Sequence, residues 1–104
     1  MLVEINGCVF LAEELRHSHG YERLDDIGKE AFVNHVHIEG NGHRPKSDAW
    51  VKRVSEALRQ GWPGQRFRIY RQSEKRETIM RFHKVRESKP NWCESGVEII
   101  EVIT

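Results

Sequence analysis

Cysteine is scarce in this chain of 104 residues, and long apolar runs are missing. The two cysteines, Cys8 and Cys93, form no CxxC pair, so a redox motif or a zinc site with paired cysteines is excluded. We expect two reduced, partly buried thiols in a cytoplasmic protein, although pairing between them stays open. The longest apolar run is Cys8–Ala12, and no basic stretch opens the sequence. We therefore expect no secretory signal, no membrane span and no membrane contact.

Charge, by contrast, is abundant and very unevenly distributed. Residues 44–86 carry thirteen Lys or Arg against four Asp or Glu. Residues 1–43 carry three basic and eight acidic side chains, and residues 87–104 carry one and four. The formal net charge of +1 therefore hides a strongly polarised chain. Such asymmetry points to an anionic partner and is the most informative feature of the sequence.

Hydrophobic periodicity and turn residues predict a single α+β domain over residues 1–104. We expect a mostly antiparallel sheet of about four to five strands, with two or three helices packed on one face. Asn6-Gly7 is a strong signal for a hairpin turn. The last strand has apolar residues on both faces, which is typical of a central strand. The predicted strands are Leu2–Ile5, Cys8–Phe10, Phe32–Glu39, Arg66–Gln72, Thr78–Arg86 and Val97–Ile103. The predicted helices are Ala12–His17, Glu22–Phe32 and a longer one, Ser47–Gln60, which Ser47 or Asp48 caps and Gly61 and Pro63 stop.

Alternation along the strands Arg66–Gln72 and Thr78–Arg86 places most of their polar residues on one open sheet face. Arginine binds phosphate oxygens in pairs and stacks on bases, and tyrosine offers a further stacking surface. The pattern therefore predicts a nucleic-acid or anion site on this hairpin. Its candidate residues are Arg66, Arg68, Tyr70, Arg81, His83 and Lys84, extended by Lys52, Arg53 and Arg59 on the long helix.

Non-catalytic binding of RNA or DNA is the interpretation that we favour, and others stay open. The basic segment can instead meet a charge-complementary protein, as in an immunity or adaptor domain, or a second copy in a homodimer. The acidic flanks can also fold back over it and form an internal salt-bridged surface. A further alternative is that the basic face is simply solvated, with charges that prevent strands from pairing edge to edge. Zinc-finger spacing, a GXXG loop, the aromatic RNP motif and a helix-turn-helix pair are all absent, so no named nucleic-acid module supports the first interpretation.

His35 and His37 share one face of a predicted strand, about 7 Å apart at Cα. With His43 after the next loop they make a weak candidate for a three-histidine metal site. The basic neighbourhood of His43 opposes a cation, so we expect a polar strand face and neither a metal nor another cofactor. No Ser, Cys or Asp is spaced with a histidine for nucleophilic catalysis.

One stretch suggests an enzyme. Arg66–Arg71, a short turn, Thr78–Arg86 and Lys89-Pro90 resemble the last strands of RelE/HigB-type mRNA-cleaving toxins, which are small α+β proteins that cut RNA without a metal. The resemblance implies that Arg68, Arg81 and Lys84 hold the scissile phosphate while His83 or Tyr70 transfers protons. The N-terminal half departs from that family, because the toxins open with a strand and a basic helical hairpin.

Overall fold

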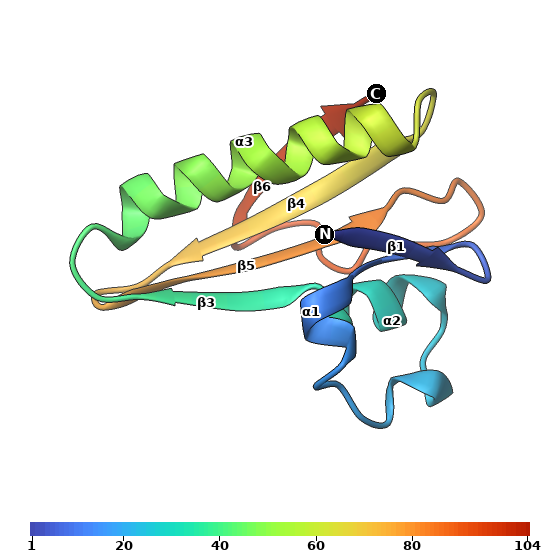
Figure 1. Ribbon diagram of the computed structural model, residues 1–104, viewed down its shortest axis with the longest axis horizontal. Coiled ribbons are helices and arrows are strands. Elements are labelled where there is room, and N and C mark those ends of the chain that lie inside the picture. Colours follow the sequence, from blue (N-terminus) through green and yellow to red (C-terminus); the bar gives the residue numbers. More distant parts are fainter.

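A computed structural model describes residues 1–104 in full and contains six strands in two antiparallel sheets (Figure 1). The smaller sheet is the hairpin of β1 (Leu2–Ile5) and β2 (Cys8–Leu11). The larger sheet has the order β3-β5-β4-β6. Its strands are β3 (His35–Glu39), β4 (Arg66–Ser73), β5 (Glu77–Lys84) and β6 (Glu98–Ile103), and the helices are α1 (Ala12–Leu15), α2 (Asp26–Val33) and α3 (His43–Gly61), with a 3-10 turn, η1, at Tyr21–Arg23. The predicted α+β class is confirmed.

Local sequence explains the N-terminal elements. Asn6 and Gly7 adopt φ values of 51° and 83°, which is the double positive φ that a tight hairpin turn requires. Asp25 caps α2 by accepting a hydrogen bond from the Gly28 amide at 2.8 Å. A Cβ at Gly28 would lie 2.9 Å from the Asp25 side chain, so glycine at this helical position permits the cap. Helix α2 extends to Val33, so β3 begins later than the predicted strand.

Helix α3 begins at His43, earlier than predicted. Gly42 precedes it with a φ of 75°, and this left-handed residue turns the chain directly into the helix. Pro45 falls in the first turn, where its missing amide hydrogen costs no helical hydrogen bond, so it does not delay the start. The helix ends at Gly61, one residue beyond the predicted end at Gln60.

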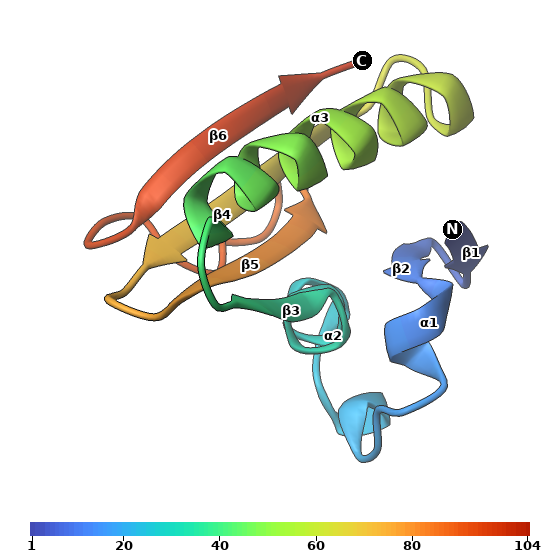
Figure 2. The same ribbon diagram turned by 60° about the vertical axis from the view of Figure 1, so that its left-hand side comes forward.

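The main core lies between α3 and one face of the larger sheet. Trp50, Val54 and Leu58 of α3 are buried against Phe67 and Ile69 of β4 and their neighbours. Helix α3 is the only helix over this face, and Val9 and Leu11 of β2 complete the core beside it. Helix α2 lies beside β5, at the start of β3 (Figure 2). None of the helices combines the length and apolar character needed to cross a membrane.

β6 is an edge strand, so its predicted central position is wrong. Both β5 and β6 run antiparallel to β4 and hence parallel to each other. A chain that connects two parallel strands must return along the full strand length, and here it must also pass β4. Residues 85–97 (the crossover loop) make this connection across the sheet face opposite α3.

Two buried polar side chains join the two sheets. Glu30 accepts hydrogen bonds from the Val9 amide at 2.7 Å and from the Lys84 amide at 3.0 Å. Asn34 accepts from the Leu11 amide at 2.8 Å and donates to the Val9 carbonyl at 2.8 Å. Both side chains are fully buried. They therefore replace backbone pairing between β2 and the part of β5 that β3 does not reach.

Candidate nucleic-acid interface

The register of β4 and β5 confirms the predicted sharing of one sheet face. Arg68 lies directly opposite His83, and Tyr70 lies opposite Arg81. Arg66 occupies the same face at the start of β4. The sequence pattern thus identified which side chains gather on the face that α3 leaves uncovered.

The prediction that this face is open is wrong, because the crossover loop covers its centre. His83 is fully buried, and Tyr70 retains only 2% of its exposure. Trp92 lies against the Tyr70 ring with centroids 5.1 Å apart, and its own ring centroid is 4.8 Å from the Arg81 guanidinium carbon. The physical cause is the strand order, which forces residues 85–97 to cross β4.

Tyr70 and His83 form a closed hydrogen-bonded pair under this loop. His83 Nδ1 lies 2.9 Å from the Lys84 carbonyl, so this nitrogen carries the ring proton. His83 Nε2 then accepts from the Tyr70 hydroxyl at 2.8 Å and from the Trp92 amide at 3.3 Å. Burial lowers the pKa of His83 and raises the pKa of Tyr70, so both rings are held neutral. Their proton-transfer atoms are occupied, and a substrate would reach them only if the crossover loop left the sheet.

Arg68 is also occupied. Its guanidinium contacts Glu101 at 2.8 Å and Glu94 at 3.2 Å and donates to the Cys93 carbonyl at 3.3 Å. Its side chain keeps 15% of its exposure. A phosphate would therefore have to displace two carboxylates from this arginine.

Two further arginines of the basic segment bind carboxylates of the flanks or of α3. Arg71 projects from the opposite sheet face and pairs with Asp48 and with Glu98, the latter at 2.7 Å. Arg86 pairs with the buried Glu30 at 2.6 Å. Five acidic residues outside positions 44–86 thus form ion pairs with arginines of the basic segment: Asp26, Glu30, Glu94, Glu98 and Glu101. This is the folding back of the acidic flanks that the sequence left open as an alternative.

The remaining predicted residues lie elsewhere on the molecule. Lys52, Arg53 and Arg59 are exposed on the outer side of α3, across the sheet from Arg68 and His83. Arg66 is exposed at the start of β4, and it borders a shallow hollow together with the half-buried Lys84. The predicted set therefore divides into a covered sheet face, a helix surface and one end of the hairpin.

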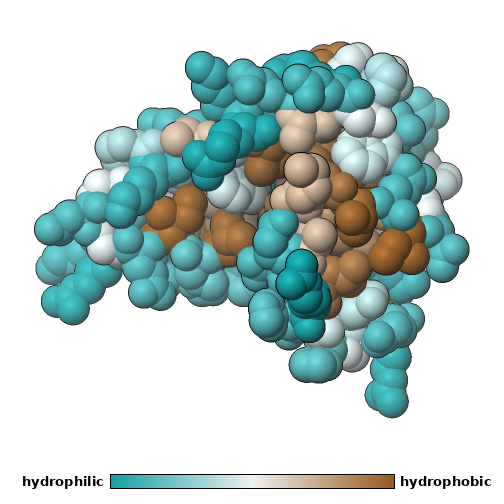
Figure 3. All heavy atoms as spheres, in the orientation of Figure 1, coloured by the Kyte–Doolittle hydropathy of each residue, from teal (hydrophilic) through white to brown (hydrophobic).

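The outer side of α3 carries several exposed cations close together, whereas Arg68 at the centre of the sheet face is held in ion pairs. Lys46, Lys52, Arg53 and Arg59 (the α3 basic face) are all exposed, and no carboxylate lies within ion-pair distance of any of them. Asp48 on the same helix is held by Arg71. Hydrophilic side chains accordingly line the surface along α3 in Figure 3, at the top of that view.

The three candidate metal-binding histidines do not converge. His35 and His37 lie together on β3 with ring centroids 4.6 Å apart, but His37 is bonded to Glu77 at 2.8 Å. His43, at the start of α3, is bonded to the Thr78 hydroxyl at 2.7 Å. No group of three His, Cys, Asp or Glu side chains is arranged to hold a metal ion.

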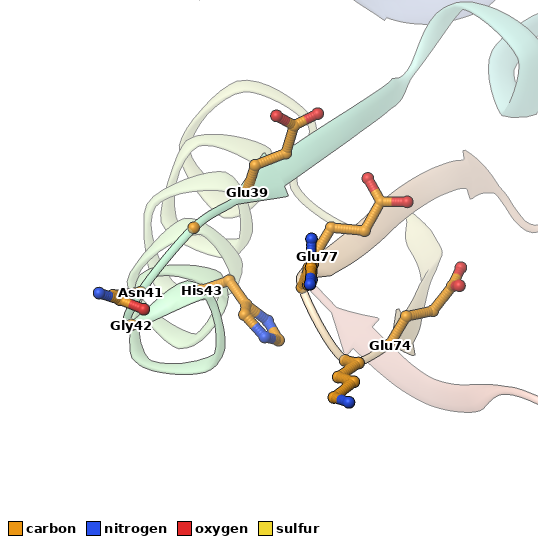
Figure 4. A pocket seen from close by; sticks show the side chains of 9 residues that line it. Glu39, Asn41, Gly42, His43, Glu74 and Glu77 are labelled. Carbon is orange, nitrogen blue, oxygen red and sulfur yellow. The ribbon is translucent and has the colours of Figure 1, made fainter.

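A polar hollow opens between the β3–α3 loop and the tip of the β4–β5 hairpin (Figure 4). Residues 39–43 and 74–77 line it, and His43 projects into it. Its lining combines Glu39, Glu74 and Glu77 with Lys75 and Arg76. This balance of charge favours neither an anion nor a cation.

Cys8 and Cys93 are both free. Burial, reinforced by Glu30 and Asp26, raises the pKa of the Cys8 thiol to about 11, so this cysteine is not a nucleophile at neutral pH. Cys93 is partly exposed in the crossover loop, where its thiol donates to the Ser95 carbonyl at 2.9 Å.

The sequence analysis missed the structural role of Glu30 and Asn34. One signal was available: Ile27, Glu30, Ala31 and Asn34 repeat at the spacing of a buried helical stripe. Polar residues on such a stripe require buried partners. Their partners on β2 and β5 are distant in sequence, however, so the spacing alone does not identify them.

The chain matches no protein-family model, no curated protein and no solved structure.

Proposed function

We propose that the protein is a non-catalytic binding domain that contacts a polyanion, RNA or DNA, through the α3 basic face. One observation carries the proposal: Lys46, Lys52, Arg53 and Arg59 are exposed without a carboxylate partner, while Arg68, Arg71 and Arg86 are bound by carboxylates. A free surface cation releases counterions from a nucleic acid when it contacts a phosphate. A cation that must first leave its ion pair contributes much less to the binding free energy.

The length of the α3 basic face suits a nucleic-acid backbone. Lys46 and Arg59 are separated by 13 positions of a continuous helix, which corresponds to about 20 Å along its axis. Duplex DNA advances about 3.4 Å per base pair, so this surface spans about six base pairs. Nothing in this arrangement reads base edges, and we therefore expect binding with little sequence preference.

The salt dependence of binding tests the proposal. Four phosphate contacts predict a slope of log K against log salt of about −3.6 for duplex DNA. The association constant should then fall by about two orders of magnitude between about 50 and 200 mM salt. Fluorescence anisotropy of labelled duplex DNA and single-stranded RNA, titrated at several salt concentrations, measures this slope.

Matched variants locate the surface. Lys52→Gln and Arg59→Gln should each reduce the steepness of the slope by about one, because each removes one phosphate contact. Arg23→Gln on η1 removes another exposed cation, away from α3, and should leave the slope unchanged. Arg68→Gln should also leave it unchanged, since Arg68 is already held by Glu94 and Glu101.

Two outcomes would overturn the proposal. If neither nucleic acid binds at low salt, the free cations serve another partner, and recovery of an acidic protein from native lysate becomes the next experiment. If Arg68→Gln weakens binding more than Arg59→Gln does, the sheet face is the contact surface and the crossover loop must move when the ligand binds.

A further inference from the structure

We propose that the protein forms a homodimer by antiparallel pairing of β6 with β6 of a second copy. This inference is independent of polyanion binding. β6 is the last strand of the larger sheet, and Figure 2 shows it along the outer border of the molecule. Helix α3 lies over β5 and β3, and no backbone group of the crossover loop forms a hydrogen bond with Ile99, Glu101 or Ile103.

The outer edge of β6 carries a regular row of free backbone groups. The Thr104 amide bonds to the Gln65 carbonyl on the β4 side. Successive residues of a strand direct their backbone groups to opposite sides, so every second residue before Thr104 also faces β4. The residues whose amide and carbonyl groups face outward are therefore Ile99, Glu101 and Ile103.

This edge has few of the features that normally prevent strands from associating. β6 contains no proline, no lysine and no glycine, and it pairs with β4 in unbroken register. Its two charged residues, Glu98 and Glu101, are each bound by an arginine of the same chain. Ile103 keeps 69% of its exposure, and Ile99 and Ile100 are partly exposed. Apolar residues on both faces led the sequence to predict a strand with two neighbours, and a second copy supplies the missing neighbour.

The strand is self-complementary about Glu101. With the two-fold axis at this residue, Ile99 lies opposite Ile103 of the partner copy, and Ile100 lies opposite Val102 of the partner copy. All outward backbone groups then find partners across the axis. Glu101 faces its own equivalent, and the ion pair of each carboxylate with Arg68 of its own chain at 2.8 Å offsets part of the repulsion between them. A two-fold axis at any other residue of β6 would not place Ile99 opposite Ile103.

Pairing of this kind produces a continuous eight-stranded sheet with one copy of α3 from each chain on the same side. The axis runs perpendicular to the sheet, so it exchanges the chains without exchanging the faces. Two α3 basic faces would therefore be presented together.

Sedimentation equilibrium of the full chain tests the dimer. We expect a monomer–dimer equilibrium at micromolar concentration. Ile103→Lys should lower the association constant by about a hundredfold, because the axis applies the change twice and each copy loses an apolar contact. Phe32→Lys is the matched control, since Phe32 is also an exposed apolar residue, at 47%, but lies on α2. A monomer at high micromolar concentration, or an equal effect of both variants, would overturn the proposal.

Disulfide trapping in a Cys93→Ser background tests the register. Directly opposite residues that share hydrogen bonds have Cα atoms about 5.5 Å apart, which a disulfide can span. Glu101→Cys should therefore cross-link to itself under mild oxidation. Glu98→Cys should not, because its two copies would lie about 20 Å apart. Equal cross-linking of both variants would show random collision and would refute the pairing.

Discussion

The buried carboxylate of Glu30 gives the sharpest prediction about stability. It accepts hydrogen bonds from the Val9 amide, the Lys84 amide and the Arg86 guanidinium, and it is fully buried. In Glu30→Gln, the new NH2 group would face at least one of these donors, and the charge that balances Arg86 would be lost. The variant keeps the size of the side chain, so packing is preserved and the polar effect is isolated.

The expected loss follows from these contacts. A buried donor left without a partner costs about 1–3 kcal/mol, and removal of one member of a buried ion pair costs about 3–5 kcal/mol. Arg86 keeps 14% of its exposure and can be partly hydrated, so the lower part of this range applies. We expect the free energy of unfolding to fall by about 3 kcal/mol, and the Tm to fall by about 12–24 °C for a domain of this size.

Urea unfolding, followed by tryptophan fluorescence and far-UV circular dichroism, measures the change. Glu56→Gln on the exposed surface of α3 is the control and should change stability by less than about 0.5 kcal/mol. Combination with Arg86→Gln completes a double-mutant cycle, in which the double variant should be more stable than the sum of the single losses predicts. A loss below about 1 kcal/mol in Glu30→Gln, or an additive cycle, would refute the reasoning.

Three further predictions follow from buried polar groups and thiols. Asn34→Ala should lower the free energy of unfolding by about 2–4 kcal/mol because it leaves backbone groups of β2 unpaired, and urea unfolding with a loss below 1 kcal/mol would contradict this. Burial lowers the folded-state pKa of His83 and of His35 below 6.5, so their contribution to stability is complete above that pH and is lost as the pH falls below it. The urea midpoint should therefore be lower at about pH 5.5 than at about pH 7.5, and His83→Gln should reduce the difference between the two midpoints. An aromatic disulfide reagent should react with Cys93 in the native protein and with Cys8 only after unfolding, and mass spectrometry of the modified peptides would reveal the opposite order.

The parts of the fold that the sequence predicted well depend on local rules. Asn6-Gly7 determined the first hairpin, and the spacing of Trp50, Val54 and Leu58 identified the buried face of α3. Period-two alternation assigned Arg68 and His83 correctly to one sheet face. In each case the information lies within a few residues of the element that it specifies.

The errors arise for features that depend on the order of the strands in the folded sheet. Apolar residues on both faces of β6 suggested a central strand, but strand order is set by long-range pairing that periodicity does not encode. The same order sends the crossover loop over Tyr70 and His83, so residues predicted to be open are buried. The ion pairs of Arg68 with Glu94 and Glu101 likewise depend on this crossing, and charge counts reveal only that the acidic flanks were available.

The bridge between the two sheets also has a consequence for the order in which the chain folds during synthesis. Glu30 and Asn34 leave the ribosome before β5. The Lys84 amide and the Arg86 guanidinium, which bind the Glu30 carboxylate, have therefore not been synthesised when α2 is made. Burial of the Glu30 carboxylate must wait for them, because an isolated buried charge is strongly unfavourable. We therefore expect the hairpin and α2 to dock fully only after Arg86 emerges, so that the N-terminal third completes its structure after the middle of the chain.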